Sequence, residues 1–186
     1  MREIQRIDLE TARALIKFDA RPSVSAELAE QQLRGAVALH NILADKGFAY
    51  LADEVGLGKT YVALGVVGLL RHYYPDIRVL YIAPRENLQR KWHKEIRNFT
   101  ANNWRIADRR VKSLQGTPAV QVCPVENLLG LVHEACMNDR RDFLIRMTSF
   151  SLPLSTKGED GKWKAKRQAL LNEIPWIAKS EFDLRS

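Results

Sequence analysis

The sequence predicts an α/β fold in which a parallel sheet is flanked by helices. Two short apolar runs, FAYLA at residues 48–52 and RVLYIA at residues 78–83, have the length and the continuous hydrophobicity of buried parallel strands. The glycines at residues 56 and 58 break the first run, and Pro84 ends the second. A helix-length segment with apolar residues at three- and four-residue spacing follows each. Strands that alternate with such helices pair in parallel through right-handed crossovers.

The first predicted helix covers residues 26–46. Ser25 is placed to cap its amino end, and Gly47 stands at the usual stop position. Residues 1–20 also allow a helix, because apolar and charged side chains are mixed there, and residues 21–25 have the composition of a connector.

Two further helices follow the two predicted strands. The helix over residues 59–74 has apolar side chains at i, i+3, i+4 and i+7, and Pro75 ends it. Pro84 ends the strand at residues 78–83, and a helix with the same periodicity is predicted over residues 86–99.

The pattern is weaker after residue 100. We expect a strand around Val111 within residues 105–113, a helix that Pro124 opens, and a strand over residues 142–149. The segment STKGEDGKWKAKR at residues 155–167 is polar and basic, which predicts an exposed loop leading into a short helix.

Composition limits the classes of protein to consider. The chain has 186 residues, 46% hydrophobic and 27% charged, a balance typical of one globular domain with its own core. No apolar run is long enough to span a membrane, and the first residues do not resemble a secretion signal, so we expect a cytoplasmic location and no membrane partner. The two cysteines are too few for a disulfide scaffold, and Cys136 with His133 supplies only two zinc ligands.

The net charge of +7 is unevenly distributed. Residues 1–60 contain 8 basic and 9 acidic residues, whereas residues 61–186 contain 21 basic and 13 acidic residues. A basic surface attracts nucleic acid because it neutralises phosphates and releases counterions. A solvated surface that keeps the protein soluble explains the same charge, so charge alone leaves both interpretations open.

One segment has the composition of a phosphate-binding loop. Residues 53–60 read DEVGLGKT and lie between a predicted strand and a predicted helix. Two glycines let backbone N–H groups approach phosphate oxygens, and the start of the helix adds further N–H groups and a partial positive charge. Lys59 can reach the β and γ phosphates, and the Thr60 hydroxyl can hold Mg²⁺. Asp53 departs from the general pattern, which has glycine at that position.

The same segment resembles the first helicase motif of Swi/Snf-type ATPases in helicase superfamily 2, to which the DEAD- and DEAH-box helicases belong. That family places an acidic pair before Gly-x-Gly-Lys-Thr, so Asp53 is expected there. QLRG at residues 32–35 is similar to the family's glutamine motif, and APRENL at residues 83–88, followed by Trp92, is similar to its motif Ia. The resemblance covers residues 28–99.

The resemblance implies an ATP site. Lys59 and Thr60 would act in catalysis, with Thr60 on the Mg²⁺ that accompanies ATP, and Gln32 would read the adenine base. The residues implied to hold ATP are Gln32, Asp53, Glu54, Val55, Gly56, Leu57, Gly58, Lys59 and Thr60.

The resemblance also implies contacts to nucleic acid. Motif Ia lies near the nucleic-acid backbone in this family, so Arg85 either contacts a phosphate or serves only at the start of a helix. Arg90, Lys94 and Arg97 recur at i, i+4 and i+7 and form one basic helix face, which either binds DNA or is only solvated.

The lobe implied by this resemblance is an incomplete RecA-like P-loop lobe. We expect residues 1–24 to be an N-terminal extension, residues 25–150 a partial first RecA-like lobe, and residues 151–186 a basic loop and tail. A motor of this superfamily needs a motif II, an apolar strand ending in Asp-Glu, and the only acidic pair besides residues 53–54 is residues 159–160 in a polar loop. We therefore expect the chain to end before motif II, to lack the second motor lobe, to hydrolyse ATP poorly alone, and to be marginally stable or to self-associate.

Three classes of function follow from these observations. The leading prediction is the ATP-binding part of a helicase or translocase that depends on double-stranded DNA, with ATP and Mg²⁺ as cofactors. The missing motif II carboxylates favour a second class, a non-catalytic remnant or adaptor that binds nucleotide or DNA. The acidic pair and the motif Ia similarity disfavour a third class, a P-loop kinase or AAA-type ATPase.

Overall fold

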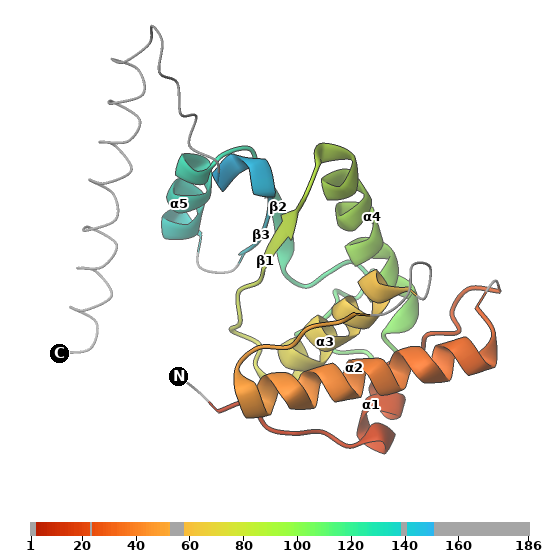
Figure 1. Cartoon of the computed structure of the whole chain (residues 1–186). Coiled ribbons are helices and arrows are strands. Elements are labelled where there is room, and N and C mark those ends of the chain that lie inside the picture. The colour runs from red at the N-terminus through yellow and green to blue at the C-terminus, as the bar shows by residue number, and fades with distance from the viewer. Residues whose placement is uncertain (1–2, 23, 53–57, 139–140, 151–186) are drawn as a thin grey trace, which may run out of the picture.

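The described part of the chain forms a three-stranded parallel sheet with helices on both of its faces (Figure 1). The structure, a computed structural model, describes residues 3–22, 24–52, 58–138 and 141–150. The elements follow the order α1 (Leu9–Leu15), α2 (Ala26–Lys46), α3 (Lys59–Tyr73), β1 (Leu80–Ala83), α4 (Glu86–Asn103), β2 (Gln121–Val125), α5 (Leu128–Met137), β3 (Arg141–Arg146) and the 3-10 helix η1 (Met147–Phe150). The predicted α/β class, with a parallel sheet flanked by helices as in an incomplete RecA-like lobe, is confirmed.

The sheet has the order β1-β3-β2, with Leu80 and Cys123 both in register with Phe143. The chain passes from β1 to the far edge at β2 through α4 and then returns to β3 through α5. Because parallel connections are right-handed, two crossovers that run in opposite directions across a sheet place their helices on opposite faces. The two hydrophobic clusters of the structure have this arrangement.

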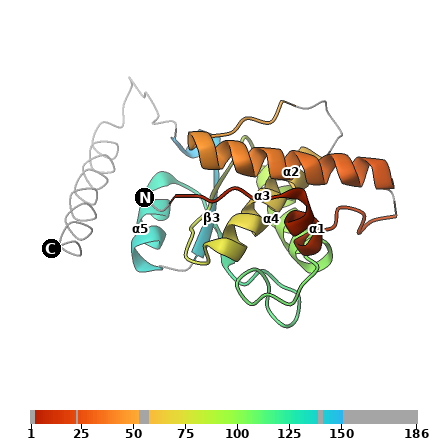
Figure 2. The same ribbon diagram turned by 90° about the horizontal axis from the view of Figure 1, so that it is seen from below.

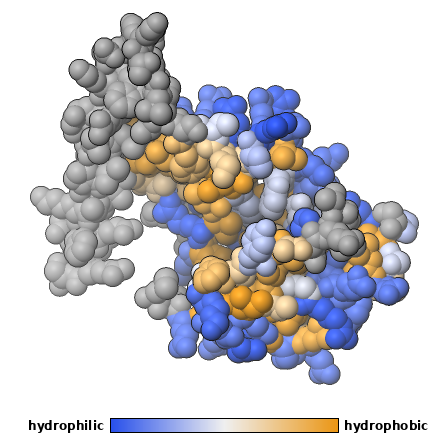
Figure 3. Space-filling model, viewed as in Figure 1, coloured by the Kyte–Doolittle hydropathy of each residue, from blue (hydrophilic) through white to orange (hydrophobic). Residues whose placement is uncertain are grey.

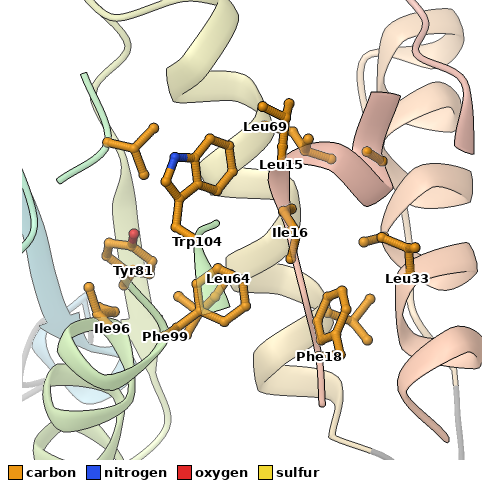
Figure 4. Close-up of a cluster of buried hydrophobic side chains, with 14 of the residues drawn as sticks. Leu15, Ile16, Phe18, Leu33, Leu64, Leu69, Tyr81, Ile96, Phe99 and Trp104 are labelled. Carbon is orange, nitrogen blue, oxygen red and sulfur yellow. The ribbon is translucent and has the colours of Figure 1, made fainter. Parts of the chain in front are cut away.

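The larger cluster fills the space between the sheet and helices α3 and α4 (Figure 4). Trp104 and Ile16 are fully buried there and form an isolated β-bridge, so the extended segment after α1 lies inside the core. The Trp104 ring packs against the backbone of α3 at Gly68, where an added Cβ would lie 3.1 Å from the ring. The N-terminal residues are thus packed into the same core as the sheet.

Helix α2 forms an outer layer on α3, as the view from below shows (Figure 2). The chain before α1 runs along α2, where the Asn41 side chain accepts a hydrogen bond from the backbone N–H of Ile7 and donates one to its carbonyl, both at 2.9 Å. As predicted, Ser25 caps α2, since its hydroxyl accepts a bond from Leu28 N, and Gly47 ends it with a φ of 75°.

The smaller cluster lies between the sheet and α5. Phe143, Ile145 and Val125 are buried there. Leu80 and Ile82 of β1 face the same side, because they are in register with Phe143 and Ile145, but they are 43% and 51% exposed. On this face of the sheet, helix α5 therefore covers β2 and β3 but not β1. Apolar side chains gather at the surface over α5 and the adjoining strands (Figure 3).

The prediction of a strand at residues 48–52 is wrong. This segment has no regular secondary structure, and its Phe48 and Tyr50 side chains are 73% and 83% exposed. A strand exists only where a neighbour completes its backbone hydrogen bonds. Among the described residues the strands pair only with one another, so this apolar run has no partner strand.

Two strand predictions after residue 100 also need correction. The expected strand around Val111 is a turn that buries this side chain and makes one bridge, between Lys112 and Pro118. The strand expected at residues 142–149 runs from Arg141 to Arg146 and then gives way to η1.

The prediction that Pro124 opens a helix is wrong. Pro124 lies inside β2, a strand that the sequence analysis did not predict. Proline lacks an N–H group and is tolerated on an edge strand, which is the position of β2. Helix α5 instead begins after Asn127, whose side chain accepts a hydrogen bond from Gly130 N at 2.8 Å.

The helices before residue 104 are close to prediction. Within residues 1–20 the helix is limited to α1. Ile16, which follows it, is extended, and Ile16 and Phe18 are both buried. Helix α3 ends before Pro75, as expected, and α4 continues four residues beyond the predicted end at residue 99, to Asn103.

Candidate functional site

The amino end of α3 carries the described part of the predicted phosphate-binding loop. Gly58 is its N-cap residue, and Lys59 and Thr60 form the first turn, with partly buried side chains. The first N–H groups of a helix have no acceptor within the helix and carry a partial positive charge, which favours a bound anion. The other predicted loop residues, Asp53, Glu54, Val55, Gly56 and Leu57, lie outside the described residues.

Gly58 brings this turn directly against α2. Its φ of 79° is left-handed, a conformation that residues with a side chain rarely adopt. An added Cβ would also lie 2.3 Å from Nε2 of Gln32, which is only 6% exposed. The structure thus brings together two positions that lie 26 residues apart, the predicted adenine-reading glutamine and the start of the Gly-Lys-Thr turn.

A cavity of about 370 Å³ borders Gln32 on α2. Its lining is mainly apolar and includes Leu28 and Gly35 of α2, Leu51, and Val62 of α3. A cavity of this size, with apolar walls and one buried carboxamide, has the character of a small-ligand pocket. Of these lining residues, Gln32 and Gly35 belong to the glutamine motif that the sequence analysis identified.

The predicted basic face lies on α4. Arg85 occupies the N-cap position with an extended backbone, and Arg90, Lys94 and Arg97 are exposed along the helix, as their spacing predicts. Arg90 donates a hydrogen bond to Glu86 at 2.5 Å, one turn earlier, so part of its charge is neutralised within the helix.

A crevice of about 450 Å³ opens beside this face, at the carboxyl ends of β2 and β3. Its polar lining includes Arg90, His93 and Arg146, and Arg146 lies 3.8 Å from the Glu86 carboxylate. The carboxyl edge of a parallel sheet is where ligands of α/β proteins usually bind. Sequence reasoning missed Arg146, because it lies 58 residues beyond the end of motif Ia.

A second group that the sequence did not indicate connects α3 to α4. The Tyr61 hydroxyl, one residue beyond Thr60, donates a hydrogen bond to Oε2 of Glu95 on α4 at 2.5 Å. Arg21 donates to the same oxygen at 3.1 Å and stacks on the Tyr61 ring. The members are separated by up to 74 residues, so no local pattern announces them.

Within the described ranges, no group of three or more histidine, cysteine or acidic residues could hold a metal ion. Thr60 lies in the first turn of α3, where a hydroxyl can ligate the Mg²⁺ that arrives with a nucleotide. None of the helices in this part of the chain combines the length and the hydrophobicity that a membrane crossing needs.

Comparison with known proteins identifies one family. The ResIII family, described as type III restriction enzyme, res subunit, matches residues 4–147, which include α2, the start of α3 and the basic helix α4. No curated protein and no solved structure matches the chain. The family is an N-terminal motor-lobe family of helicase superfamily 2, which implies an ATP-binding, helicase-like motor region. The chain therefore belongs to the ResIII family of helicase-like motor domains.

Proposed function

We propose that this domain binds Mg²⁺-ATP at the amino end of α3 as part of a motor that depends on double-stranded DNA, of the Swi/Snf type. The observation that carries the proposal is the contact between Gln32 and Gly58, because it unites the glutamine motif with the Gly-Lys-Thr turn in one place. A chance Gly-x-Gly-Lys-Thr sequence would have no reason to meet a buried glutamine on another helix.

Each residue has a chemical role in this proposal. Lys59 neutralises charge on the β and γ phosphates, while residues 53–58 and the helix end supply backbone N–H groups. The Thr60 hydroxyl holds Mg²⁺, and Gln32 hydrogen-bonds the adenine edge beside the cavity on α2. Hydrolysis also needs a carboxylate that orients the attacking water, and the acidic pair at residues 159–160 has no apolar strand before it in the sequence. We therefore expect nucleotide binding, although weak in this domain alone, to be easier to detect than turnover.

Arg85, Arg90, Lys94 and Arg97 provide the nucleic-acid contacts of the proposal. Their positive charges attract the phosphate backbone without reading sequence. The partner is double-stranded DNA, and a second motor lobe would complete the cleft. If the domain binds nucleotide but never hydrolyses it, with or without DNA, the non-catalytic adaptor becomes the better description.

The nucleotide site is tested by titrating a fluorescent ATP analogue with Mg²⁺ into wild type, Lys59→Ala and Gln32→Ala. Lys59→Ala should weaken binding at least tenfold, while ADP should compete and AMP should not, because the lysine acts on the β and γ phosphates. Lys46→Ala, at the end of α2, is the matched control and should bind as wild type does. Equal affinity of Lys59→Ala and wild type would refute the site.

The DNA surface is tested by the salt dependence of duplex binding. Removing one phosphate contact lowers the slope of log K against log salt by about 0.9. Arg97→Gln should lower it by this amount, and Arg109→Gln, an exposed arginine outside α4, should not. A slope that is the same in both variants would argue against α4 as the DNA-binding face.

A further inference from the structure

We propose that Glu95 is a positioning residue that couples the occupancy of the nucleotide site to the binding of nucleic acid on α4. The inference rests on the proposed function, because it names how its two sites communicate. It is carried by one cluster, Arg21, Tyr61 and Glu95, which joins the segment before α2 to α3 and α4.

The first connection runs from the nucleotide site to α4. Tyr61 directly follows Thr60 in the first turn of α3, and its hydroxyl donates a hydrogen bond to Glu95 Oε2 at 2.5 Å. Its ring packs edge-on against Phe99, one turn further along α4, with 5.6 Å between the ring centres. A movement of the first turn of α3 toward bound phosphate therefore acts directly on α4.

The second connection runs through the segment before α2. Arg21 donates a hydrogen bond to the same Oε2 atom at 3.1 Å, and its guanidinium carbon lies 4.0 Å from the centre of the Tyr61 ring. This segment leads into α2, which carries Gln32 against Gly58. The same carboxylate oxygen thus accepts hydrogen bonds from Tyr61, which adjoins Thr60, and from Arg21, which precedes α2.

The third connection is the position of Glu95 itself. It adjoins Lys94 and lies two residues before Arg97, yet its side chain is only 16% exposed whereas theirs are on the surface. Interactions of a charge withdrawn from water are stronger than those of a solvated charge. The Glu95 contacts therefore fix the position of α4 along its axis and its rotation about that axis, and with them the position of the basic face.

The shared oxygen provides two discrete arrangements. With the Tyr61 bond made, Glu95 binds α3 and the Arg21 segment together. With that bond broken, Arg21 remains as its partner, and α4 loses its hydrogen bond to the first turn of α3. A ligand that favours one arrangement at either site shifts the affinity of the other, and the effect is reciprocal.

The test is the coupling ratio, the dissociation constant of the fluorescent ATP analogue without duplex DNA divided by that with saturating duplex. Wild type should show a ratio that differs from one by at least about fivefold, as is typical of coupled sites. Tyr61→Phe removes a single hydroxyl and keeps the ring contacts, so nucleotide affinity without DNA should change less than about twofold and the ratio should fall to about one.

Tyr74→Phe is the matched control, because the Tyr74 hydroxyl also makes hydrogen bonds but at the opposite end of α3. It should keep the wild-type ratio. Glu95→Ala removes both connections at once and should lose coupling even if Tyr61→Phe folds poorly. Each ratio compares one variant with itself, so a general effect of charge on DNA affinity cancels.

The outcomes separate this inference from the proposed function. Coupling in wild type and Tyr74→Phe that is lost in Tyr61→Phe and Glu95→Ala supports the role of Glu95. Wild-type coupling that survives in both variants, or a wild type that binds both ligands independently, overturns the inference and leaves the nucleotide and DNA sites standing. A wild type that binds neither ligand overturns the proposed function, and the inference with it.

Discussion

Arg71 and Asp142 form an ion pair that is almost completely withdrawn from water. Nη2 of Arg71, on α3, lies 2.8 and 2.7 Å from the two carboxylate oxygens of Asp142, on β3, and the side chains are 5% and 4% exposed. Asp142 also accepts a hydrogen bond from the backbone N–H of Val79 at 3.0 Å. This single carboxylate therefore fixes α3, the segment before β1, and the central strand in relation to one another.

Asp142→Asn should destabilise the domain by about 3–5 kcal/mol, because it leaves the Arg71 charge buried without a counter-charge. Asparagine can still accept the Val79 hydrogen bond, so the lost stability reports the effect of removing the Asp142 charge alone. The double variant Arg71→Met/Asp142→Asn removes both charges and should recover a large part of this free energy. Urea unfolding followed by circular dichroism measures all three proteins, and a double variant no more stable than Asp142→Asn would contradict this account.

Gly58→Ala should destabilise the domain for two separable reasons. The left-handed backbone conformation disfavours any residue with a Cβ, at a cost of roughly 1–2 kcal/mol. The new methyl group would also collide with the Gln32 side chain. Gly58→Ala/Gln32→Ala removes the collision and keeps the backbone strain, so it should be more stable than the sum of the two single variants predicts. Thermal melts of the four proteins form the cycle, and strict additivity would show that the two residues do not touch.

The sequence predicted the local features of this fold well, because each has a local chemical cause. Ser25 and Gly47 mark the ends of α2 through capping and a left-handed stop, and Pro75 follows the end of α3. The basic spacing on α4 likewise follows from helix geometry alone. These signals depend on neighbours within about four residues, which a sequence displays directly.

The errors concern pairing between distant segments. The apolar run at residues 48–52 looks like a strand, but no described strand lies beside it, whereas Pro124 looks like a helix opener and lies in an edge strand. The cluster around Glu95 and the ion pair of Arg71 escaped prediction for the same reason, since their members are 34 to 74 residues apart. The family resemblance assigned both Gln32 and Gly58 to the ATP site, but their contact was not predicted, because no local pattern connects the two positions.

The stability of the domain should decrease between pH 7 and pH 5 through His40. Burial lowers the pKa of His40, and its Nε2 lies 2.9 Å from the Gln5 carbonyl oxygen, which opposes this shift. The unfolded chain then takes up a proton near the ordinary pKa of about 6.5, while the folded chain resists it. Protons therefore favour the unfolded state, and stability is lost as the pH falls, by at most about 1.4 kcal/mol per pH unit.

His40→Gln keeps a donor for Gln5 and removes the titration. The free energy of unfolding should depend less on pH between 7 and 5 in this variant than in wild type, with the two curves diverging as the pH falls. Chemical unfolding at several pH values gives both curves. Parallel curves would mean that His40 does not contribute to the loss of stability in acid.

The uncovered side of β1 should promote self-association. Leu80 and Ile82 are exposed side chains of β1, which lies at the edge of the described sheet and pairs there only with β3. An apolar edge of this kind is a template for pairing with another molecule. Ile82→Lys places a charge at this edge and should reduce association at high protein concentration, while changing stability by less than about 0.5 kcal/mol, because the side chain is already half exposed. Leu114→Lys removes an equally apolar side chain that is 78% exposed in a turn away from the edge, and it should associate as wild type does. Sedimentation velocity over a range of concentrations compares the three proteins. Equal association of Ile82→Lys and wild type would place the contact elsewhere on the surface.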